Sequence, residues 1–285
     1  MDNVVVNNPK NPYPGKLYNH PSLTYNVYLG CVIDYNTTFT PETLKNVLIG
    51  NDTTGGPVLK TSEKDRIFFY FTDHGSDGVM FLPDHEVFTT ADMDDALRQM
   101  TEKKMYKEML FYIDCCYAGS IFEKVIPKYE NILVITSSSP HQPAANTYCI
   151  NDTGICLGAE FSVAWLEYDD TNSTSEHTLR DQLEVLKKRT TYSNVSVYGD
   201  VSILDRKISV FQGVQLPSTP VVKMDDVHYE YETVTKPEMA TWRVGKMLER
   251  AIEAGDQQEV ARLQSELVKL QNTPWPGVKK ASKNL

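Results

Sequence analysis

Residues 66–78 read RIFFYFTDHGSDG, and residues 109–120 read MLFYIDCCYAGS. Each stretch begins as a short, continuous run of aromatic and β-branched residues, which is typical of strands buried on both faces of a parallel sheet. Residues 131–136 (NILVIT) form a third run of this kind. Residues 91–105, between the first two runs, carry apolar side chains at helical spacing. Strand, helix and strand in this order predict a βαβ unit within an α/β fold.

The first two runs end in residues that suit cysteine–histidine chemistry. His74 follows one predicted strand and Cys116 follows the next. Because ligands bind at the carboxyl ends of parallel strands, we expect both side chains to face one cleft, where a thiolate attacks a carbonyl and an imidazole transfers protons. Gly75 allows a close approach of substrate to backbone N–H groups that stabilise an oxyanion. Taken singly, His74 is typical of a hydrogen-bonded loop residue and Cys116 of a small buried residue; together they favour catalysis.

Composition excludes several classes of protein. The 285 residues carry 38 acidic and 28 basic side chains, a net charge of −10 that disfavours a nucleic-acid partner. No apolar run reaches the roughly 18 residues that a membrane span needs. The five cysteines include no CxxC pair and no zinc-like spacing, so we expect neither a metal nor another cofactor. The first residues lack the basic and apolar segments of a signal peptide.

A change in charge divides the chain near Gly213. Residues 213–285 hold 10 basic and 10 acidic side chains, so the net charge of −10 falls on residues 1–212. Residues 237–254 and 256–271 show helical patterns after a proline-containing linker. The apolar stripe of the second helix spans only about two heptads, which favours a packed helical hairpin over an oligomerising coil. We therefore predict a catalytic domain over residues 1–212 and a linker with a helical region over residues 213–285.

The motifs resemble those of the legumains, the asparaginyl endopeptidases, which are cysteine peptidases with a caspase-like fold. The similar features are HGxxG after one strand and Asp-x-Cys-x-x-Gly-Ser after the next, with further similar segments in the same order over about residues 9–212. The resemblance implies a mostly parallel sheet flanked by helices, with a C-terminal helical pro-region. It also implies that Cys116 is the nucleophile, that His74 is the catalytic histidine and that Gly75 lies at an oxyanion-stabilising position.

The resemblance also implies a pocket for the side chain of asparagine, or of aspartate at low pH, formed by an arginine and two acidic groups. Asp114 matches one acidic group, whereas Ala159 stands at the position of the other and Glu160 follows it. Ser138 lies close in sequence to the family's pocket serines, and we include it with Asp114 and Glu160 as predicted substrate-binding residues. The arginine belongs to a segment that the resemblance places ahead of Met1, together with the first strand and the first helix. We therefore expect an N-terminally incomplete domain.

Further expectations concern covalent features and location. The resemblance implies a disulfide between Cys149 and Cys156, with two reduced thiols as the alternative. Cys115 is either a tolerated small residue or a redox partner of Cys116. Five N-x-S/T sequons fit a lysosomal, vacuolar or secretory route; they begin at Asn36, Asn51, Asn151, Asn172 and Asn194.

Together, these features predict a legumain-like cysteine endopeptidase that hydrolyses protein or peptide substrates after asparagine or aspartate. Residues 213–285 are expected to cover the cleft as an inhibitor until they are removed. Two alternatives stay open. One is a relative of the catalytic subunit of the GPI transamidase, which shares the cysteine–histidine pair, and the other is an inactive, truncated homologue that acts by binding.

Overall fold

The structure is a computed structural model, and it describes residues 13–23, 25–35, 39–53, 55–83, 86–150, 154–214 and 232–273. Its centre is a four-stranded sheet in the order β1-β5-β6-β9. Strands β1 (Arg66–Thr72), β5 (Glu108–Asp114) and β6 (Ile132–Thr136) run parallel, and β9 (Ser196–Gly199) is antiparallel to β6. The predicted α/β fold with a mostly parallel sheet is confirmed, and the three predicted strands agree with the observed ones to within one residue.

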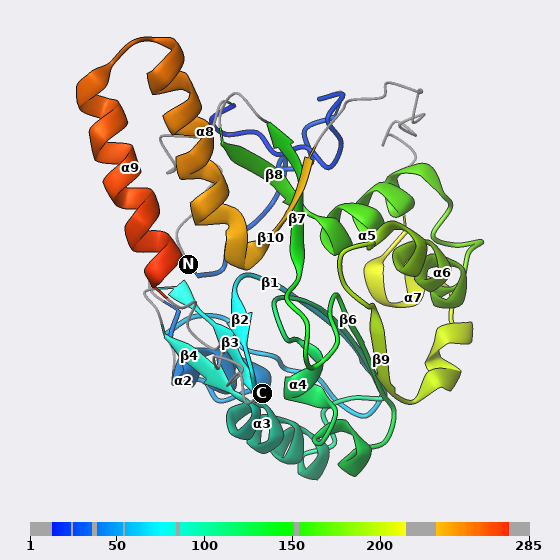
Figure 1. The fold of residues 1–285 in the computed structure, drawn as a ribbon. Helices are drawn as coiled ribbons and strands as arrows, with labels where there is room; N and C mark the ends of the chain where they lie inside the picture. The colour runs from blue at the N-terminus through cyan, green and yellow to red at the C-terminus, as the bar shows by residue number, and fades with distance from the viewer. Residues whose placement is uncertain are drawn as a thin grey trace, which may run out of the picture.

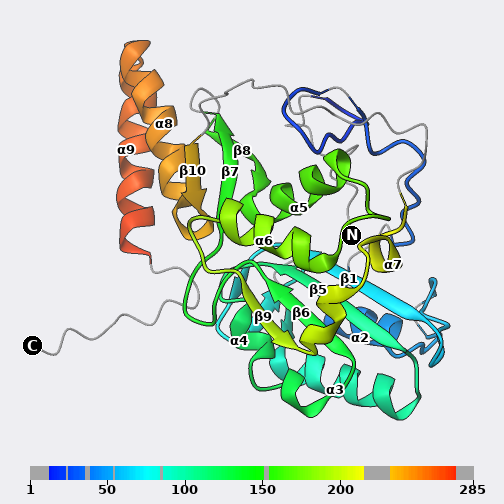
Figure 2. The same ribbon diagram turned by 90° about the vertical axis from the view of Figure 1, so that its right-hand side faces the viewer.

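Helices cover both faces of this sheet (Figure 2). Helices α2 (Pro41–Leu48) and α3 (Thr90–Glu102) pack on one face, and α5 (Glu160–Thr171) and α6 (Leu179–Arg189) pack on the other. Alternate residues of β5 point to the two cores: Phe111 to the first and Tyr112 to the second. All seven residues of β5 are buried, as expected for the inner strand of a parallel sheet.

Local signals set the ends of the helices. Thr89 and Thr178 cap α3 and α6, each through a capping box with the aspartate three residues later. Helix α3 ends at Glu102, three residues before the helix end that the sequence predicts at Met105. Lys104 adopts a positive φ of 52°, which turns the chain at this point.

Smaller elements surround the carboxyl edge of the sheet. Strands β2, β3 and β4 form a short antiparallel sheet directly after β1. The remaining short elements connect the larger ones. The bounds are β2 (Gly75–Ser76), β3 (Val79–Phe81), β4 (Val87–Thr89), α4 (Gly119–Phe122), η2 (Ile126–Lys128), η3 (Val201–Asp205) and α7 (Ser209–Gln212).

The C-terminal region joins the rest of the molecule through a third sheet, in the order β10-β7-β8. Strands β7 (Ala145–Ile150) and β8 (Ile155–Ala159) form a hairpin, and β10 (Glu232–Thr235) pairs antiparallel with β7. The turn η4 (Lys236–Glu238) leads into the predicted helical hairpin, formed by α8 (Met239–Glu253) and α9 (Gln257–Asn272), which stands beside this sheet (Figure 1). Within the described ranges, no helix combines the length and the apolar character that crossing a membrane requires.

Candidate active site

The loops that carry His74 and Cys116 lie side by side. Strands β1 and β5 stay in register up to Thr72 and Asp114, and the Asp73 N–H donates to the Asp114 carbonyl at 3.3 Å. A Cβ atom on Gly75 would lie 2.6 Å from the Cys116 carbonyl oxygen. The structure therefore brings the two loops together, and the contact leaves room only for glycine.

Residues of the Gly-Ser motif hold the turn that follows the cysteine. Tyr117 adopts a positive φ of 57°, which is a sharp bend for a residue with a large side chain. The Ser120 hydroxyl donates to the Tyr117 carbonyl at 2.6 Å and accepts the Gly78 N–H at 2.8 Å. Ser120 thus links the cysteine loop to the histidine loop, a role that the sequence analysis did not assign to it.

Ser138 supports the same turn from behind. Its hydroxyl donates to the Cys115 carbonyl at 2.9 Å and accepts the Ala118 N–H at 3.1 Å. The side chain is fully buried. In this structure Ser138 therefore positions the cysteine turn, and its predicted contact with substrate stays a prediction.

Asp114 is fully buried and is held in a fixed orientation. Its Oδ2 atom accepts hydrogen bonds from the Ser162 N–H at 3.1 Å and from the Ser162 hydroxyl at 2.6 Å. Ser162 lies in the first turn of α5, where the helix dipole favours a negative charge. The second oxygen, Oδ1, points away from Ser162 and meets a cation.

That cation is Lys236, at the start of the C-terminal helical region. Its ammonium donates to the Asp73 carbonyl at 3.1 Å, to the Asp114 carbonyl at 2.9 Å and to Asp114 Oδ1 at 3.1 Å. Only 4% of the lysine is exposed. Lys236 carries no signal of this contact in the sequence, because no spacing pattern connects residues that are separated by 122 positions or more.

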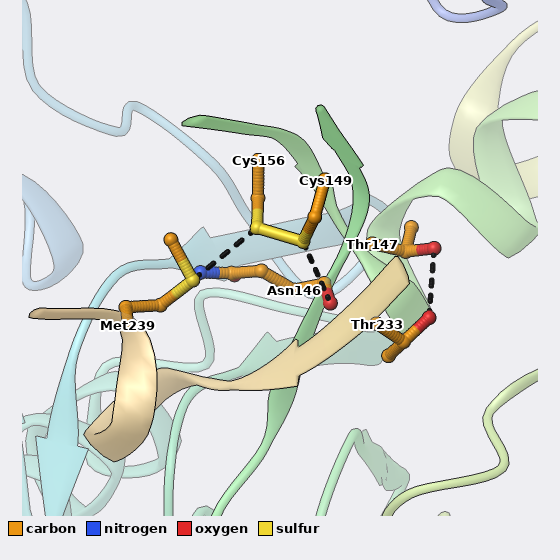
Figure 3. The surroundings of a disulfide bond; sticks show 6 residues. All are labelled: Asn146, Thr147, Cys149, Cys156, Thr233 and Met239. Atoms are coloured by element: carbon orange, nitrogen blue, oxygen red, sulfur yellow. Dashed lines mark hydrogen bonds between the residues drawn. A yellow bond between two sulfur atoms is a disulfide. The ribbon is translucent and has the colours of Figure 1, made fainter. Parts of the chain in front are cut away.

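Strand β10, which directly precedes Lys236, holds it in this position. It pairs with β7 at Val234 and Thr235, and Thr147 and Thr233 join their hydroxyls across the two strands at 3.2 Å (Figure 3). The Lys236 N–H then donates to the Ala144 carbonyl at 2.9 Å. The Cys116 thiol contacts the same carbonyl, at 4.0 Å, so the backbone of Lys236 lies beside the candidate nucleophile.

A disulfide braces this sheet. Cys149 and Cys156 face each other across β7 and β8 and are bonded in the structure. The Met239 sulfur lies 3.3 Å from the Cys156 sulfur, so the start of α8 rests on the disulfide (Figure 3). The disulfide thus supports both the hairpin and the C-terminal region that packs against it.

The surroundings of the two reactive groups favour their neutral forms. Burial raises the pKa of the Cys116 thiol, although a hydrogen bond with the Ala144 backbone and the charge of Lys236 act in the opposite direction. Partial desolvation lowers the pKa of His74, whose side chain is exposed at the surface; Asp73 opposes that shift and Lys236 reinforces it. Cys116 is fully buried, so a substrate cannot reach it in this arrangement. Burial raises the pKa of Cys115 as well, and its side chain packs in the core on the α3 face, as expected for a small apolar residue.

Glu160 holds the loop that follows α6. Its Oε1 atom accepts the Thr191 N–H at 3.0 Å and the Thr191 hydroxyl at 2.7 Å, and Oε2 accepts the Tyr192 N–H at 3.2 Å. Both carboxylate oxygens are therefore engaged by the segment that follows α6. Its predicted role in substrate binding stays a prediction.

The other predicted sites fall in different parts of the chain. Asn51 and Asn194 are exposed, whereas the Asn172 amide donates to the Tyr168 carbonyl and the Thr171 hydroxyl. Asn36 and Asn151 lie outside the described residues. Across the described ranges, no three His, Cys, Asp or Glu side chains gather as a metal site would require.

Comparisons with known proteins place the chain among peptidases. The profile described as the peptidase C13 family matches residues 1–214. The chain is 34% identical to legumain of Canavalia ensiformis over 232 residues, 75% of this chain and 49% of that protein. It is 34% identical to the vacuolar-processing enzyme β-isozyme of Arabidopsis thaliana, over 80% of this chain and 50% of that protein. It is also 30% identical to legumain of Bos taurus, over 92% and 60% respectively.

The chain therefore spans about half the length of several curated relatives that it matches. Among solved structures, caspase-1 of Spodoptera frugiperda aligns with a TM-score of 0.38 and 14% identity. The alignment covers 57% of this chain and 68% of that one, and a likeness of this size carries no argument.

Proposed function

Because the chain belongs to the peptidase C13 family, we propose that it is a cysteine endopeptidase with Cys116 as nucleophile and His74 as its proton-transfer partner. One observation carries the assignment of residues. The two loops leave adjacent parallel strands and touch where Gly75 meets the Cys116 carbonyl. The resemblance to legumains is confirmed at the level of the family.

The proposed reaction proceeds through a thioester. His74 takes the proton of the Cys116 thiol as the sulfur attacks the carbonyl carbon of the scissile bond, and the N–H groups of Gly75 and Cys116 stabilise the resulting oxyanion. The carbon–nitrogen bond breaks as His74 gives a proton to the leaving amine. Water, deprotonated by His74, then hydrolyses the thioester and regenerates the thiol.

The proposed specificity is cleavage after asparagine, and after aspartate at low pH, as the family resemblance implies. Asp114 supports it, because Ser162 holds Oδ2, and displacement of Lys236 would leave Oδ1 available to an incoming side chain. An asparagine amide could donate a hydrogen bond to that oxygen.

We further propose that the C-terminal region keeps the enzyme latent until it is displaced. Lys236 fills the space beside Asp114, and Cys116 is fully buried in the chain that carries the C-terminal region. Lys236→Ala should raise hydrolysis of an asparagine reporter peptide above the wild-type rate. Lys269→Ala, on the exposed side of α9, is the matched control. Equal rates in wild type and Lys236→Ala would reject latency through this contact.

The test of the peptidase uses the same reporter at acid pH. In the full chain carrying Lys236→Ala, adding Cys116→Ala should lower the rate by at least about 10³-fold, because triad-type nucleophiles contribute this much or more. Adding Cys115→Ala should leave most of the activity. If the Cys116→Ala protein hydrolyses the peptide at an undiminished rate, Cys116 is not the nucleophile.

A lysosomal, vacuolar or secreted location is the third part of the proposal. The disulfide between Cys149 and Cys156 is typical of oxidising compartments. One relative carries "vacuolar" in its name, and the exposed sequons at Asn51 and Asn194 are accessible to a glycosyltransferase.

A further inference from the structure

A cavity of about 840 Å³ lies where the C-terminal region meets the loop that follows α6. Tyr192 of that loop lines one part of it, and residues of β10, η4 and the first turn of α8 line the rest. Among the described residues, the lining includes none of Cys116, His74 and Asp114. The cavity is therefore distinct from the candidate active site, and its volume falls within the range of about 300–1,000 Å³ that is usual for small-molecule sites.

The lining combines aromatic rings with one negative charge. Four of its residues contribute aromatic or apolar surface: Tyr192, Val234, Pro237 and Trp242. Glu238 is the one charged residue in the described part of the lining. Its Oε2 atom accepts the Thr235 hydroxyl at 2.5 Å, and this neutral donor leaves the negative charge of the carboxylate in place.

This composition favours an organic cation over other small molecules. The faces of tryptophan and tyrosine rings attract cations, and a carboxylate in the same cavity adds to that attraction. An anion would be repelled by Glu238 and by the ring faces. A metal ion would find a single carboxylate, whereas calcium takes six to eight oxygen ligands. The cavity therefore suits a cation with an aromatic or alkyl body, which would also cover Val234 and Pro237.

The two sides of the cavity belong to segments that are held separately. The Tyr192 N–H donates to Glu160 Oε2 at 3.2 Å, which fixes the loop that follows α6. On the other side, Val234 is buried and pairs with Asn146 of β7. Because 54% of Tyr192 is exposed and Glu238 is also exposed, a ligand can enter from solvent and contact both segments.

We propose that this cavity binds an organic cation with an aromatic or alkyl body, and that the bound cation holds the C-terminal region against the loop that follows α6. A ligand that contacts both segments loses its site when the C-terminal region is displaced, so its binding stabilises the closed arrangement by mass action. The effect on latency rests on the proposed function. Binding itself does not, because it needs no chemistry at Cys116.

Calorimetric titration of the full-length protein with benzyltrimethylammonium chloride tests the site, with sodium chloride as the salt control. We expect saturable binding of the cation and at least about 10-fold weaker binding of benzyl alcohol, which has a similar apolar body without the charge. Benzenesulfonate, an anion of similar size, should not bind. Equal affinity for the cation and the alcohol, or no saturable binding of the cation, would overturn the proposal.

Substitutions in the lining locate the bound cation. Glu238→Gln removes the charge and keeps the shape, and Trp242→Leu removes the aromatic ring, so each should weaken binding at least about 5-fold. Glu249→Gln, on the exposed side of α8 and outside the lining, is the matched control and should bind as wild type does. If Trp242→Leu does not fold, Glu238→Gln decides, because its side chain is exposed. Unchanged affinity in Glu238→Gln would overturn the assignment to this cavity.

Alkylation of Cys116, followed by mass spectrometry, tests whether the cation holds the C-terminal region in place. At ten times its dissociation constant, benzyltrimethylammonium should slow labelling of the wild-type protein about 10-fold, because it binds the closed arrangement alone. At the same concentration it should have a smaller effect on Glu238→Gln. Binding of the cation with no change in labelling would overturn the effect on the C-terminal region. Failure of Lys236→Ala to hydrolyse any reporter peptide, with the cation still bound by wild type, would count against the proposed function and leave the cation site standing.

Discussion

The central sheet and the C-terminal region meet at Asp114, and they are held in very different ways. Strand β5 is buried along its whole length between two large cores. Among the described residues, the buried cluster between α8 and α9 consists of Val244, Ala251 and Leu263. Contacts between the described C-terminal residues and the rest of the molecule include the pairing of β10 with β7, the hydrogen bonds of Lys236 and the contact of Met239 with the disulfide.

The central sheet therefore builds the candidate site, whereas the C-terminal region is the part that we propose controls access to it. The sheet positions the loops of His74 and Cys116 through its own core, whereas the C-terminal region is joined to them by strand pairing, by the hydrogen bonds of Lys236 and by Met239. A buried ion pair such as Lys236–Asp114 is costly to break when the freed charge stays buried. In the proposed release from latency, displacing the whole segment would expose Asp114 to water, so the freed charge would not stay buried.

The same substitution in the two regions should have opposite consequences. Gly75→Ala forces a Cβ to within 2.6 Å of the Cys116 carbonyl, so it should destabilise the fold by about 2 kcal/mol or more and lower activity at least 100-fold. Gly245→Ala lies in α8, where no heavy atom of the described residues beyond the local helix lies within 4 Å of the new Cβ. It should stabilise the protein by up to about 1 kcal/mol.

Chemical unfolding and peptide hydrolysis measure both variants. Tolerance of Gly75→Ala with unchanged activity would mean that the two loops are not packed as closely as described. A loss of activity in Gly245→Ala equal to that in Gly75→Ala would remove the distinction between the regions.

Removal of the disulfide probes the connection between the regions. Replacing Cys149 and Cys156 by serine should lower the free energy of unfolding by about 2 kcal/mol, as expected for a loop this short. Because Met239 rests on the disulfide, the cover should also loosen, and Cys116 should be alkylated faster than in wild type. A lower melting temperature with an unchanged alkylation rate would show that the disulfide supports the hairpin alone.

Asp169, on α5, gives the sheet region a pH dependence that the C-terminal region should not share. Burial raises its pKa to about 7, while a hydrogen bond from Gln182 acts in the opposite direction. The folded state therefore binds the proton more tightly than the unfolded chain. This contribution to stability is full below the ordinary aspartate pKa of about 4 and is lost as pH rises toward 7.

The carboxamide side chain of the Asp169→Asn variant does not ionise, so it stays neutral as the pH rises. The variant should match wild type near pH 4 and exceed it by about 1–3 kcal/mol near pH 8. Urea unfolding at the two pH values measures the difference. A gap between the proteins that stays constant with pH would show that Asp169 is not protonated in the folded state near neutrality.

The sequence could predict the strands and the two reactive loops because these features depend on neighbouring residues. The runs that became β1, β5 and β6 are continuous and apolar, and His74 and Cys116 follow two of them directly. The contact of Asp114 with Ser162 spans 48 residues and that with Lys236 spans 122, so only the folded chain reveals them. Glu160 is predicted to bind substrate from its position next to Ala159. Both its oxygens accept hydrogen bonds from a segment about 30 residues later in the chain, which the sequence does not reveal, and its role in substrate binding stays a prediction.

The most direct measurement is the alkylation rate of Cys116 in the full chain, resolved from Cys31 and Cys115 by mass spectrometry of the cysteine-containing peptides. We predict slow labelling of Cys116 in wild type and in Lys269→Ala, and labelling at least 10-fold faster in Lys236→Ala. Cys115 should stay protected in all three proteins, because it lies in the core. Equal labelling of Cys116 in wild type and Lys236→Ala would contradict the claim that Lys236 holds the C-terminal region over the nucleophile.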